Sequence, residues 1–454
     1  MKNNVELIFI PAPAVGHLRL IDRNDSVSVT ILAIKTTLPS PATDSYTKSI
    51  EASQTRIKLV HVPQVLDPPP PELLRSPFKY FSLYIESHRH QVKAIVADVL
   101  STGRVARLVV DFFCVSMIDV AHELGLPSYV FMASNAGAMA LMLHLSTPQN
   151  QISSSGITFS DPDMVVPGIS DPVSPRVLPS SLMDGSYESY VKVGAKFRET
   201  RGILINTFEE LEPFALDSFR GGTTPPVYPV GPVIDLEGSQ QAHLNPDPVQ
   251  RQSIIDWLDQ QPPKSVVFLC FGSMGTFDPA QVKEIALGLD RSQNRFLWSL
   301  RTSAKPEDDV FPNGFLDRVK GRGMVCGWAP QVEILAHRAV GGFVSHCGWN
   351  SVLESLWHGV PIATWPLYAE QQLNAFRMVR ELGLAEELRV DYRRGGGGGL
   401  VTAEEIERAV RRVMESDSEV GKKLKEMGAV ARSVVLDGGS SFVAMGSFID
   451  DLMS

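Results

Sequence analysis

Residues 328–371 read WAPQVEILAHRAVGGFVSHCGWNSVLESLWHGVPIATWPLYAEQ. In this stretch the apolar run Gly342–Ser345 predicts a buried strand, and the small residues after it predict a tight turn. The apolar residues of Ser351–His358 then recur at the spacing of a helix. A strand, a short turn and a helix in this order are typical of α/β proteins with parallel sheets.

The same alternation extends in both directions along the chain. Helical spacing recurs in Pro279–Arg291 and Ala403–Met414. Further aliphatic runs predict strands at Val5–Ile10, Val27–Ile34, Leu108–Asp111, Tyr129–Met132, Ile203–Asn206, Val266–Cys270, Phe296–Leu300 and Ile362–Thr364. We therefore expect parallel sheets covered by helices on both faces.

A Pro- and Gly-rich stretch in the middle of the chain indicates a domain boundary. Residues 221–248 read GGTTPPVYPVGPVIDLEGSQQAHLNPDP, a composition typical of linkers. The prediction is a first domain over 1–232, a linker over 233–248 and a second domain over 249–439. Ligands of open α/β sheets bind beyond the carboxyl ends of the strands, so functional residues should follow strands. The runs Pro63–Pro77 and Gly395–Gly399 are expected to lack regular structure.

Composition excludes several classes of function. Lys plus Arg number 42 against 51 Asp plus Glu, a formal net charge of −9 without any basic run, which disfavours a nucleic-acid partner. The four cysteines lie far apart with no CxxC, so neither a disulfide framework nor a zinc site is expected, and a reducing cytoplasm fits best. Even the apolar stretch Val105–Val120 contains Arg107, Asp111 and Asp119, which argues against a membrane span.

Several well-known catalytic fingerprints are missing from the sequence. No GxGxxG follows a strand, and GxxxxGK[ST], HExxH and GxSxG do not occur. Nicotinamide-dependent oxidoreductases, P-loop enzymes and serine hydrolases are therefore disfavoured.

The turn His346-Cys-Gly-Trp-Asn-Ser351 is the strongest candidate for a ligand site. A helix N-terminus after a small-residue turn offers free backbone N–H groups and a positive dipole end, which suit a phosphate. Two alternatives remain open from the residues alone. Ser351 and Glu354 have the spacing of a capping box, and His346 has the position of a structural imidazole at a strand end.

The whole segment from Trp328 to Gln371 closely resembles the plant secondary product glycosyltransferase box of the family 1 UDP-sugar glycosyltransferases. The resemblance extends from the first strand to the C-terminal helix and is nearest to plant enzymes that glucosylate phenolics and flavonoids. It implies the GT-B fold, in which two Rossmann-like domains face each other. It also implies that a last helix, over residues 440–454, returns to the first domain.

The resemblance assigns the nucleotide to four residues of the box. It implies that Trp328 stacks on uracil and that the backbone of Ala329 pairs with the edge of the base. Gln331 and Glu354 are implied to hold the ribose hydroxyls. A flat indole suits a base, and a carboxylate suits a vicinal diol.

The diphosphate is assigned to the turn and to a second strand end. His346, Asn350 and Ser351 are implied to contact it at the helix N-terminus, beside Gly348. Ser273, in Phe271-Gly-Ser, is implied to face it from another strand end.

The donor sugar is assigned to Trp349 and to the closing pair Glu370 and Gln371. In the family a final Gln accompanies UDP-glucose, so glucose is the expected sugar. From the residues alone, Glu370 and Gln371 could equally begin a helix with an acidic first turn.

Acceptor residues are expected in the first domain. Gly16-His17 follows the strand Val5–Ile10, and the resemblance implies that His17 is the general base and that Asp111 bonds its other ring nitrogen. Asp111 could instead cap a helix over residues 114–124. Gly16 and Phe112 are the candidate residues of the acceptor pocket.

One segment departs from the family pattern. Only the nine residues Leu18–Ser26 separate His17 from the strand at Val27, where family members carry several helical turns. A βαβ crossover needs about 10–12 residues including its helix, a minimum that the whole connection over residues 11–26 just meets. The first helix is therefore expected to be short, and His17 could be out of place. This leaves open a UDP-sugar-binding protein with weak or no turnover.

The resemblance implies an inverting transfer of glucose from UDP-glucose to a hydroxyl of a small phenolic or flavonoid-like metabolite. The expected partners are the UDP-sugar and a small hydrophobic acceptor, and neither a metal nor another cofactor is implied. The protein is expected to be a cytoplasmic monomer.

Overall fold

The structure is a computed structural model, and it describes residues 5–12, 27–35, 57–102, 105–150, 156–236, 248–301, 310–394 and 399–454. The chain forms two compact units. The first comprises Met1–Pro175, Ser180–Ile234 and Val434–Ser454, and the second comprises Arg176–Pro179 and Asp235–Ser433. The segment after His17 and most of the glycine run, residues 395–398, lie outside the described residues.

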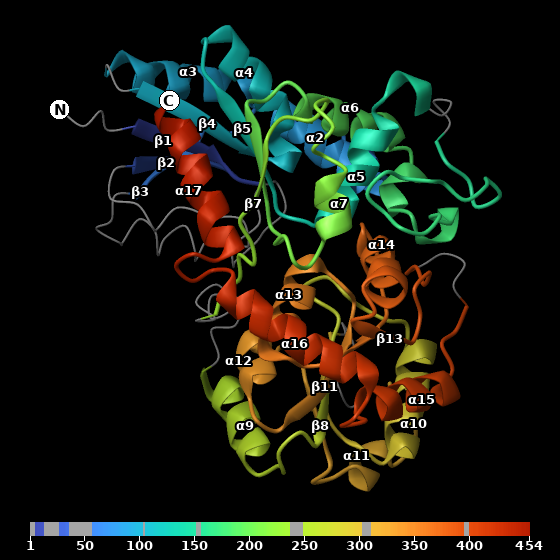
Figure 1. Cartoon of the computed structure of the whole chain (residues 1–454). Coiled ribbons are helices and arrows are strands. Elements are labelled where there is room, and N and C mark those ends of the chain that lie inside the picture. Colours follow the sequence, from blue (N-terminus) through green and yellow to red (C-terminus); the bar gives the residue numbers. More distant parts are fainter. Residues whose placement is uncertain are drawn as a thin grey trace. The chain divides into compact units, whose positions relative to one another are not determined.

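The first unit is built on a seven-stranded parallel sheet in the order β3-β2-β1-β4-β5-β6-β7 (Figure 1). Its strands are β1 Val5–Ile10, β2 Val27–Ile34, β3 Ile57–Val62, β4 Val105–Asp111, β5 Ser128–Met132, β6 Gly202–Ile205 and β7 Val227–Pro229. Every residue of β1, β5 and β6 is buried, which explains why these strands appear in the sequence as largely apolar runs. The exception in β1 is Glu6, a buried carboxylate that accepts from Thr30 of β2 at 2.6 Å.

Helices connect these strands. The α-helices are α2 Pro77–Ser87, α3 Arg89–Ser101, α4 Ile118–Glu123, α5 Ala136–Leu145, α6 Tyr187–Phe197, α7 Pro213–Asp217 and α17 Ser440–Met453. Short 3-10 helices are η2 Pro71–Arg75, η3 Phe112–Met117, η4 Pro148–Asn150, η5 Pro175–Val177 and η6 Ser180–Leu182. None of the helices in the described ranges is long and apolar enough to cross a membrane.

The C-terminal helix α17 packs on the sheet of the first unit. Phe448 and Leu452 belong to the same buried cluster as Phe9 of β1, and the Phe448 ring meets Tyr129 of β5 edge-on at 5.2 Å between centroids. The Tyr129 hydroxyl donates to the Asp451 carboxylate at 2.6 Å. Both the apolar face and a partly buried polar end therefore fix this helix to β5.

Two expectations about the first unit are wrong in part. The stretch Pro63–Pro77 contains the 3-10 helix η2 and the first residue of α2, because proline at the first position of a helix loses no hydrogen bond. The single helix expected over residues 114–124 is two elements, η3 and α4, with non-helical backbone angles at Cys114.

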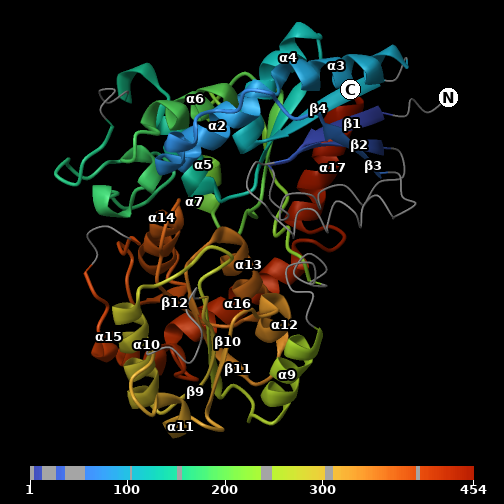
Figure 2. The same ribbon diagram turned by 180° about the vertical axis from the view of Figure 1, so that it is seen from behind.

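The second unit has a six-stranded parallel sheet in the order β10-β9-β8-β11-β12-β13 (Figure 2). Its strands are β8 Val266–Cys270, β9 Arg295–Ser299, β10 Gly323–Cys326, β11 Val340–Ser345, β12 Ile362–Thr364 and β13 Ala385–Glu387. Its helices are α9 Pro248–Asp259, α10 Pro279–Ser292, α11 Phe315–Arg318, α12 Gln331–Ala336, α13 Trp349–His358, α14 Gln371–Phe376, η7 Arg377–Glu381, α15 Ala403–Val413 and α16 Glu419–Ser433. The predicted α/β class with two parallel sheets is confirmed.

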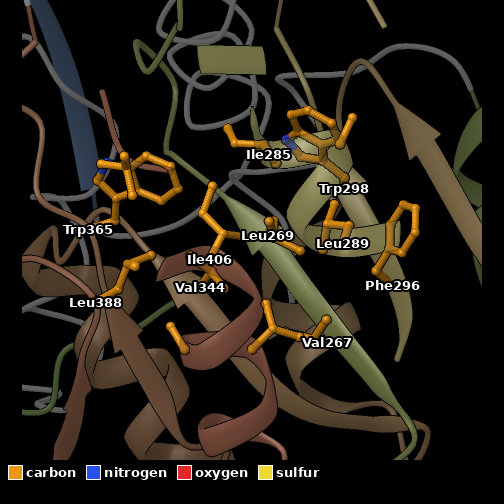
Figure 3. Packing of buried hydrophobic residues seen from close by; sticks show 14 of the residues in the cluster. Val267, Leu269, Ile285, Leu289, Phe296, Trp298, Val344, Trp365, Leu388 and Ile406 are labelled. Atoms are coloured by element: carbon orange, nitrogen blue, oxygen red, sulfur yellow. The ribbon is translucent and has the colours of Figure 1, made fainter. Parts of the chain in front are cut away.

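A dense core holds the strands of this sheet in place (Figure 3). Leu269 of β8 and Val344 of β11 are fully buried in it, as is Trp298 of β9. Helices α10 and α15 pack so closely on each other that a Cβ at Gly288 would lie 2.7 Å from the Cβ of Ile406. Cores of this density deform little, so the strand ends that carry the site are rigidly placed.

Candidate functional site

Five strands of the second sheet end at the same level. The paired residues run in register from Cys326 through Ser299, Cys270 and Ser345 to Thr364. Loops that follow these residues must therefore leave the sheet along one edge, which is where open α/β sheets bind ligands.

The predicted donor-binding residues follow these strand ends. Ser273 comes after β8, Trp328 and Ala329 come after β10, His346 comes after β11, and the pair Glu370–Gln371 comes after β12. The second unit thus brings all of them to one edge of its sheet. Their individual roles stay predictions.

His346 is a buried, neutral imidazole. Its side chain is 6% exposed, and burial lowers its pKa to about 4, while the carbonyl of Cys270 acts in the opposite direction. The ring therefore carries one N–H and no charge at neutral pH. The Nδ1 atom has no hydrogen-bond partner within the described residues.

Two glycines enclose the Nε2 atom of this ring. A Cβ at Gly272 or at Gly348 would lie 2.6 Å from Nε2, closer than any real contact. Gly272 also has a φ of +73°, which glycine adopts without strain, whereas Gly348 has an ordinary φ of −61°. The ring is therefore positioned by two backbone segments that tolerate no side chain.

Gln331, Ser351 and Glu354 form one buried hydrogen-bonded group. The Nε2 atom of Gln331 donates to Ser351 Oγ and to Glu354 Oε2, each at 2.7 Å. Burial raises the pKa of Glu354 to about 7, the bond from Gln331 partly opposes this shift, and the charge of Asp235 adds to it. This carboxyl group therefore changes its charge near neutral pH, far above an ordinary glutamate.

The capping-box alternative for Ser351 and Glu354 is wrong. Helix α13 begins at Trp349 with Gly348 as its N-cap and without a capping side chain. Ser351 consequently lies inside the first turn of the helix. Its hydroxyl accepts a hydrogen bond from Gln331 and does not cap the N-terminal N–H groups. The first N–H groups of this ten-residue helix have no capping side chain and suit an anion.

The amide oxygen of Gln371 is hydrogen-bonded to the loop that precedes it. This Oε1 atom accepts from the backbone N–H groups of Leu367, at 2.9 Å, and Tyr368, at 3.1 Å. The NH₂ group carries the remaining donors of this side chain, and its hydrogen bond with Tyr368 partly opposes the rise that burial causes in the pKa of that tyrosine. The alternative that Glu370 and Gln371 begin a helix is confirmed in part: α14 begins at Gln371 with Glu370 as its N-cap, but its first turn holds no acidic residue.

In the first unit, Asp111 is fully buried at the end of β4. Its carboxylate accepts from the backbone N–H of Phe113 at 2.9 Å and caps η3, as the helix-capping alternative predicts. The half-buried Phe112 ring lies 4.2 Å from that of Phe113. Gly16 and His17 lie outside the described residues, so the pairing of His17 with Asp111 stays a prediction.

The sequence analysis missed three residues of this edge. Gly272 follows the buried strand β8, and a glycine at that place was the available signal for a close approach. Asn374 donates to the carbonyl of Cys347 at 3.0 Å and ties α14 to the turn after β11. The charge of Asp235 raises the pKa of Glu354. Because the two residues are far apart in the sequence, no local pattern indicates this interaction.

Known proteins share this architecture. A family model described as UDP-glucoronosyl and UDP-glucosyl transferase matches residues 227–422. The chain is 58% identical over 477 aligned positions to UDP-glycosyltransferase 71K1 of Malus domestica, with 99% of each chain covered. It is 46% identical to flavonol 3-O-glucosyltransferase UGT71C4 of Arabidopsis thaliana, covering 100% of this chain and 98% of the relative. The crystal structure of Medicago truncatula UGT71G1 complexed with UDP-glucose matches with a TM-score of 0.92 and 48% identity, over 100% of this chain and 99% of that one.

These similarities extend the resemblance of residues 328–371 to the whole chain. The two parallel sheets have the GT-B fold, like that of UGT71G1. The chain therefore belongs to the UGT71 group of plant family 1 UDP-glycosyltransferases, enzymes that transfer a sugar from a UDP-sugar to small plant molecules.

Proposed function

We propose that this enzyme transfers glucose from UDP-glucose to a hydroxyl of a small phenolic or flavonoid-like acceptor, with inversion at the anomeric carbon. The observation that carries the proposal is the buried group of Gln331, Ser351 and Glu354 at the N-terminal end of α13. It places a carboxyl group suited to a diol next to a helix end suited to a diphosphate. The UDP-glucose complex of UGT71G1 and the flavonol named for the Arabidopsis relative support this choice of substrates.

In this proposal the nucleoside is held at the ends of β10 and α12. Trp328 stacks on uracil, and the backbone of Ala329 pairs with the edge of the base. Gln331 and Glu354 hold the ribose hydroxyls. The carboxyl group of Glu354 accepts hydrogen bonds from these hydroxyls best when it is ionised.

The diphosphate and the sugar lie beyond the nucleoside. Ser273, His346, Asn350 and Ser351 bind the diphosphate together with the N-terminus of α13. Because charge develops on the diphosphate as the glycosidic bond breaks, these donors stabilise the transition state more than the bound substrate. The glucose hydroxyls are held by the side chains of Trp349, Glu370 and Gln371.

His17 is the proposed general base. A phenol with a pKa of about 10 is a poor nucleophile at neutral pH until a nearby base accepts its proton during attack. The acceptor oxygen then bonds to the anomeric carbon from the face opposite UDP, which leaves with the electron pair of the broken bond. Asp111 supports the imidazolium that His17 becomes, and Gly16 and Phe112 line the acceptor pocket.

The direct test is mass spectrometry after incubation with UDP-glucose and a pool of simple phenols and flavonols. We expect a hexose adduct in the presence of a chelator, because the helix end and neutral donors take the place of a divalent cation. We also expect the adduct to be lost in His17→Ala. Activity that a chelator removes and magnesium restores, or an unchanged rate in His17→Ala, would contradict the corresponding part of the proposal.

A specific observation favours slow turnover as the other outcome. The alignment with UDP-glycosyltransferase 71K1 spans 477 positions, 23 more than the 454 residues of this chain, so the relative holds at least that many residues that this chain lacks. The short segment between His17 and Val27 is one place where residues are expected to be missing. A protein that UDP stabilises against heat but that forms no adduct would have an intact donor site and a displaced base.

The affinity for UDP-glucose is expected to rise with pH. Glu354 has a pKa of about 7, so between about pH 6 and pH 8 it passes from mostly protonated to mostly ionised. The ionised carboxylate accepts hydrogen bonds from both ribose hydroxyls. The affinity for UDP-glucose should therefore rise up to about tenfold over this range. The phosphodiester groups of UDP-glucose do not titrate in this range, nor does His346 with a pKa of about 4. Isothermal calorimetry would measure the change.

The matched control for this prediction is Glu333→Gln. Glu333 lies on the same helix as Gln331 but forms an exposed ion pair with Arg251 at 2.6 Å. Its variant should keep the pH dependence, whereas Glu354→Gln should abolish it. A pH dependence that survives in Glu354→Gln would remove this carboxyl group from ribose binding.

A further inference from the structure

We propose that Arg394 is a positioning residue that couples two loops of the donor site, and this inference rests on the proposed function above. The diphosphate loop is residues 271–278, which connect β8 to α10 and carry Ser273. The sugar loop is residues 365–370, which connect β12 to α14 and lead to Gln371. Arg394 follows β13 and belongs to neither loop.

The guanidinium of Arg394 holds the diphosphate loop. Its Nη1 donates to the carbonyl of Met274 at 2.8 Å and to Thr276 Oγ1 at 3.2 Å. One residue earlier, the carbonyl of Ser273 accepts from the guanidinium of Arg301. Two arginines from different elements therefore fix consecutive carbonyls of the loop, and charged donors form the stronger hydrogen bonds.

The same residue holds the sugar loop by two other contacts. The backbone N–H of Arg394 donates to the carbonyl of Leu367 at 3.1 Å. Its guanidinium carbon lies 5.9 Å from the centre of the Tyr368 ring, within the range of a cation–π contact. Leu367 and Tyr368 are also the two residues whose N–H groups fix the amide of Gln371.

Arg394 thus connects the residue after Ser273 with the residues that orient Gln371. A flat guanidinium can donate at its edge while its face rests on a ring, which a lysine ammonium cannot do. Phe271 and Phe277 of the diphosphate loop also pack on Trp365 of the sugar loop, at 5.5 and 5.1 Å between ring centroids. Loss of Arg394 should therefore loosen the segments next to Ser273 and Gln371 without separating the two loops. The nucleoside residues Trp328, Gln331 and Glu354 form no contact with Arg394 that the described structure shows.

The test compares the binding of UMP and UDP-glucose by calorimetry to the parent, Arg394→Ala, Arg394→Lys and Arg380→Ala. Arg380 is the matched control, because it forms an exposed ion pair with Glu387 at 2.7 Å. We expect Arg394→Ala to weaken UDP-glucose about fivefold and UMP much less, since the two loops hold the diphosphate and the sugar, and UMP carries one phosphate and no sugar. Arg394→Lys should recover only part of the loss, and Arg380→Ala should behave like the parent.

Steady-state kinetics adds a second readout. In Arg394→Ala the KM for UDP-glucose should rise more than kcat falls, because the chemical groups at the acceptor stay in place. Equal weakening of UMP and UDP-glucose would show a general structural role and overturn the inference, as would unchanged binding of both. A parent protein that binds UMP but not UDP-glucose would refute the proposed function itself, whatever the variants do.

Discussion

Asp111→Asn is expected to lower kcat by about a thousandfold while leaving the melting temperature close to that of the parent. The Oδ1 atom of asparagine can still accept from the N–H of Phe113, so the cap of η3 is retained. A neutral amide, however, cannot stabilise the imidazolium that forms when His17 accepts the acceptor proton. Saturating kinetics and thermal unfolding of the same preparation would measure both quantities.

Two further variants separate catalysis from capping. Asp111→Ala should lose the cap as well and should cost about 1 kcal/mol of stability. Asp119→Asn is the matched control, because Asp119 lies nearby on α4 but pairs with Arg89 at 3.2 Å and Lys196 at 2.6 Å. If Asp111→Asn retains the full rate, Asp111 acts only as the cap of η3 and the proposed support of His17 is wrong.

Gly272→Ala is expected to weaken UDP-glucose binding by about a hundredfold. The added Cβ would lie 2.6 Å from His346 Nε2, so either the ring or the diphosphate loop must move by about 1 Å. A displacement of about 1 Å can cost on the order of a hundredfold in reaction rate, and we expect a loss of similar size in affinity where the donors must match the diphosphate. Calorimetric titration with UDP-glucose would measure the loss.

Backbone strain and steric contact can be separated with two other glycines. Gly348→Ala introduces the same 2.6 Å contact at an ordinary φ of −61°, so it should also weaken binding. Gly321 has a φ of +76° and nothing within 4 Å of an added Cβ, so Gly321→Ala should lose about 1 kcal/mol of stability and no affinity. Equal affinities in Gly272→Ala and Gly321→Ala would show that the contact with His346 does not matter.

Sequence patterns predicted the buried strands well. Each of the nine predicted runs falls on an observed strand, because strands buried on both faces need continuous apolar residues. The prediction missed the four strands at the sheet edges, β3, β7, β10 and β13. These strands are short or partly exposed, so they form no continuous apolar run in the sequence.

The residue types of the donor site could also be expected from the sequence. The turn after Gly342–Ser345 and the helix after it were recognisable, and the structure places His346 and Gly348 there. What the pattern could not decide was the partner of Ser351. A serine three residues before a glutamate fits a capping box, and only the position of Gln331 on α12 shows that both side chains serve another bond.

The sequence by itself determined the α/β class and the parallel strands, because local hydrophobic spacing and turn residues encode them. The predicted donor segment over residues 328–371 came from its resemblance to the family's box. Only the tertiary structure decided that Gly272 encloses His346 and that Arg394 connects the loops after β8 and β12. Arg394 and Met274 are separated by 120 residues. Contacts of this kind arise from the order of strands in the sheet, and no local pattern in the chain encodes them.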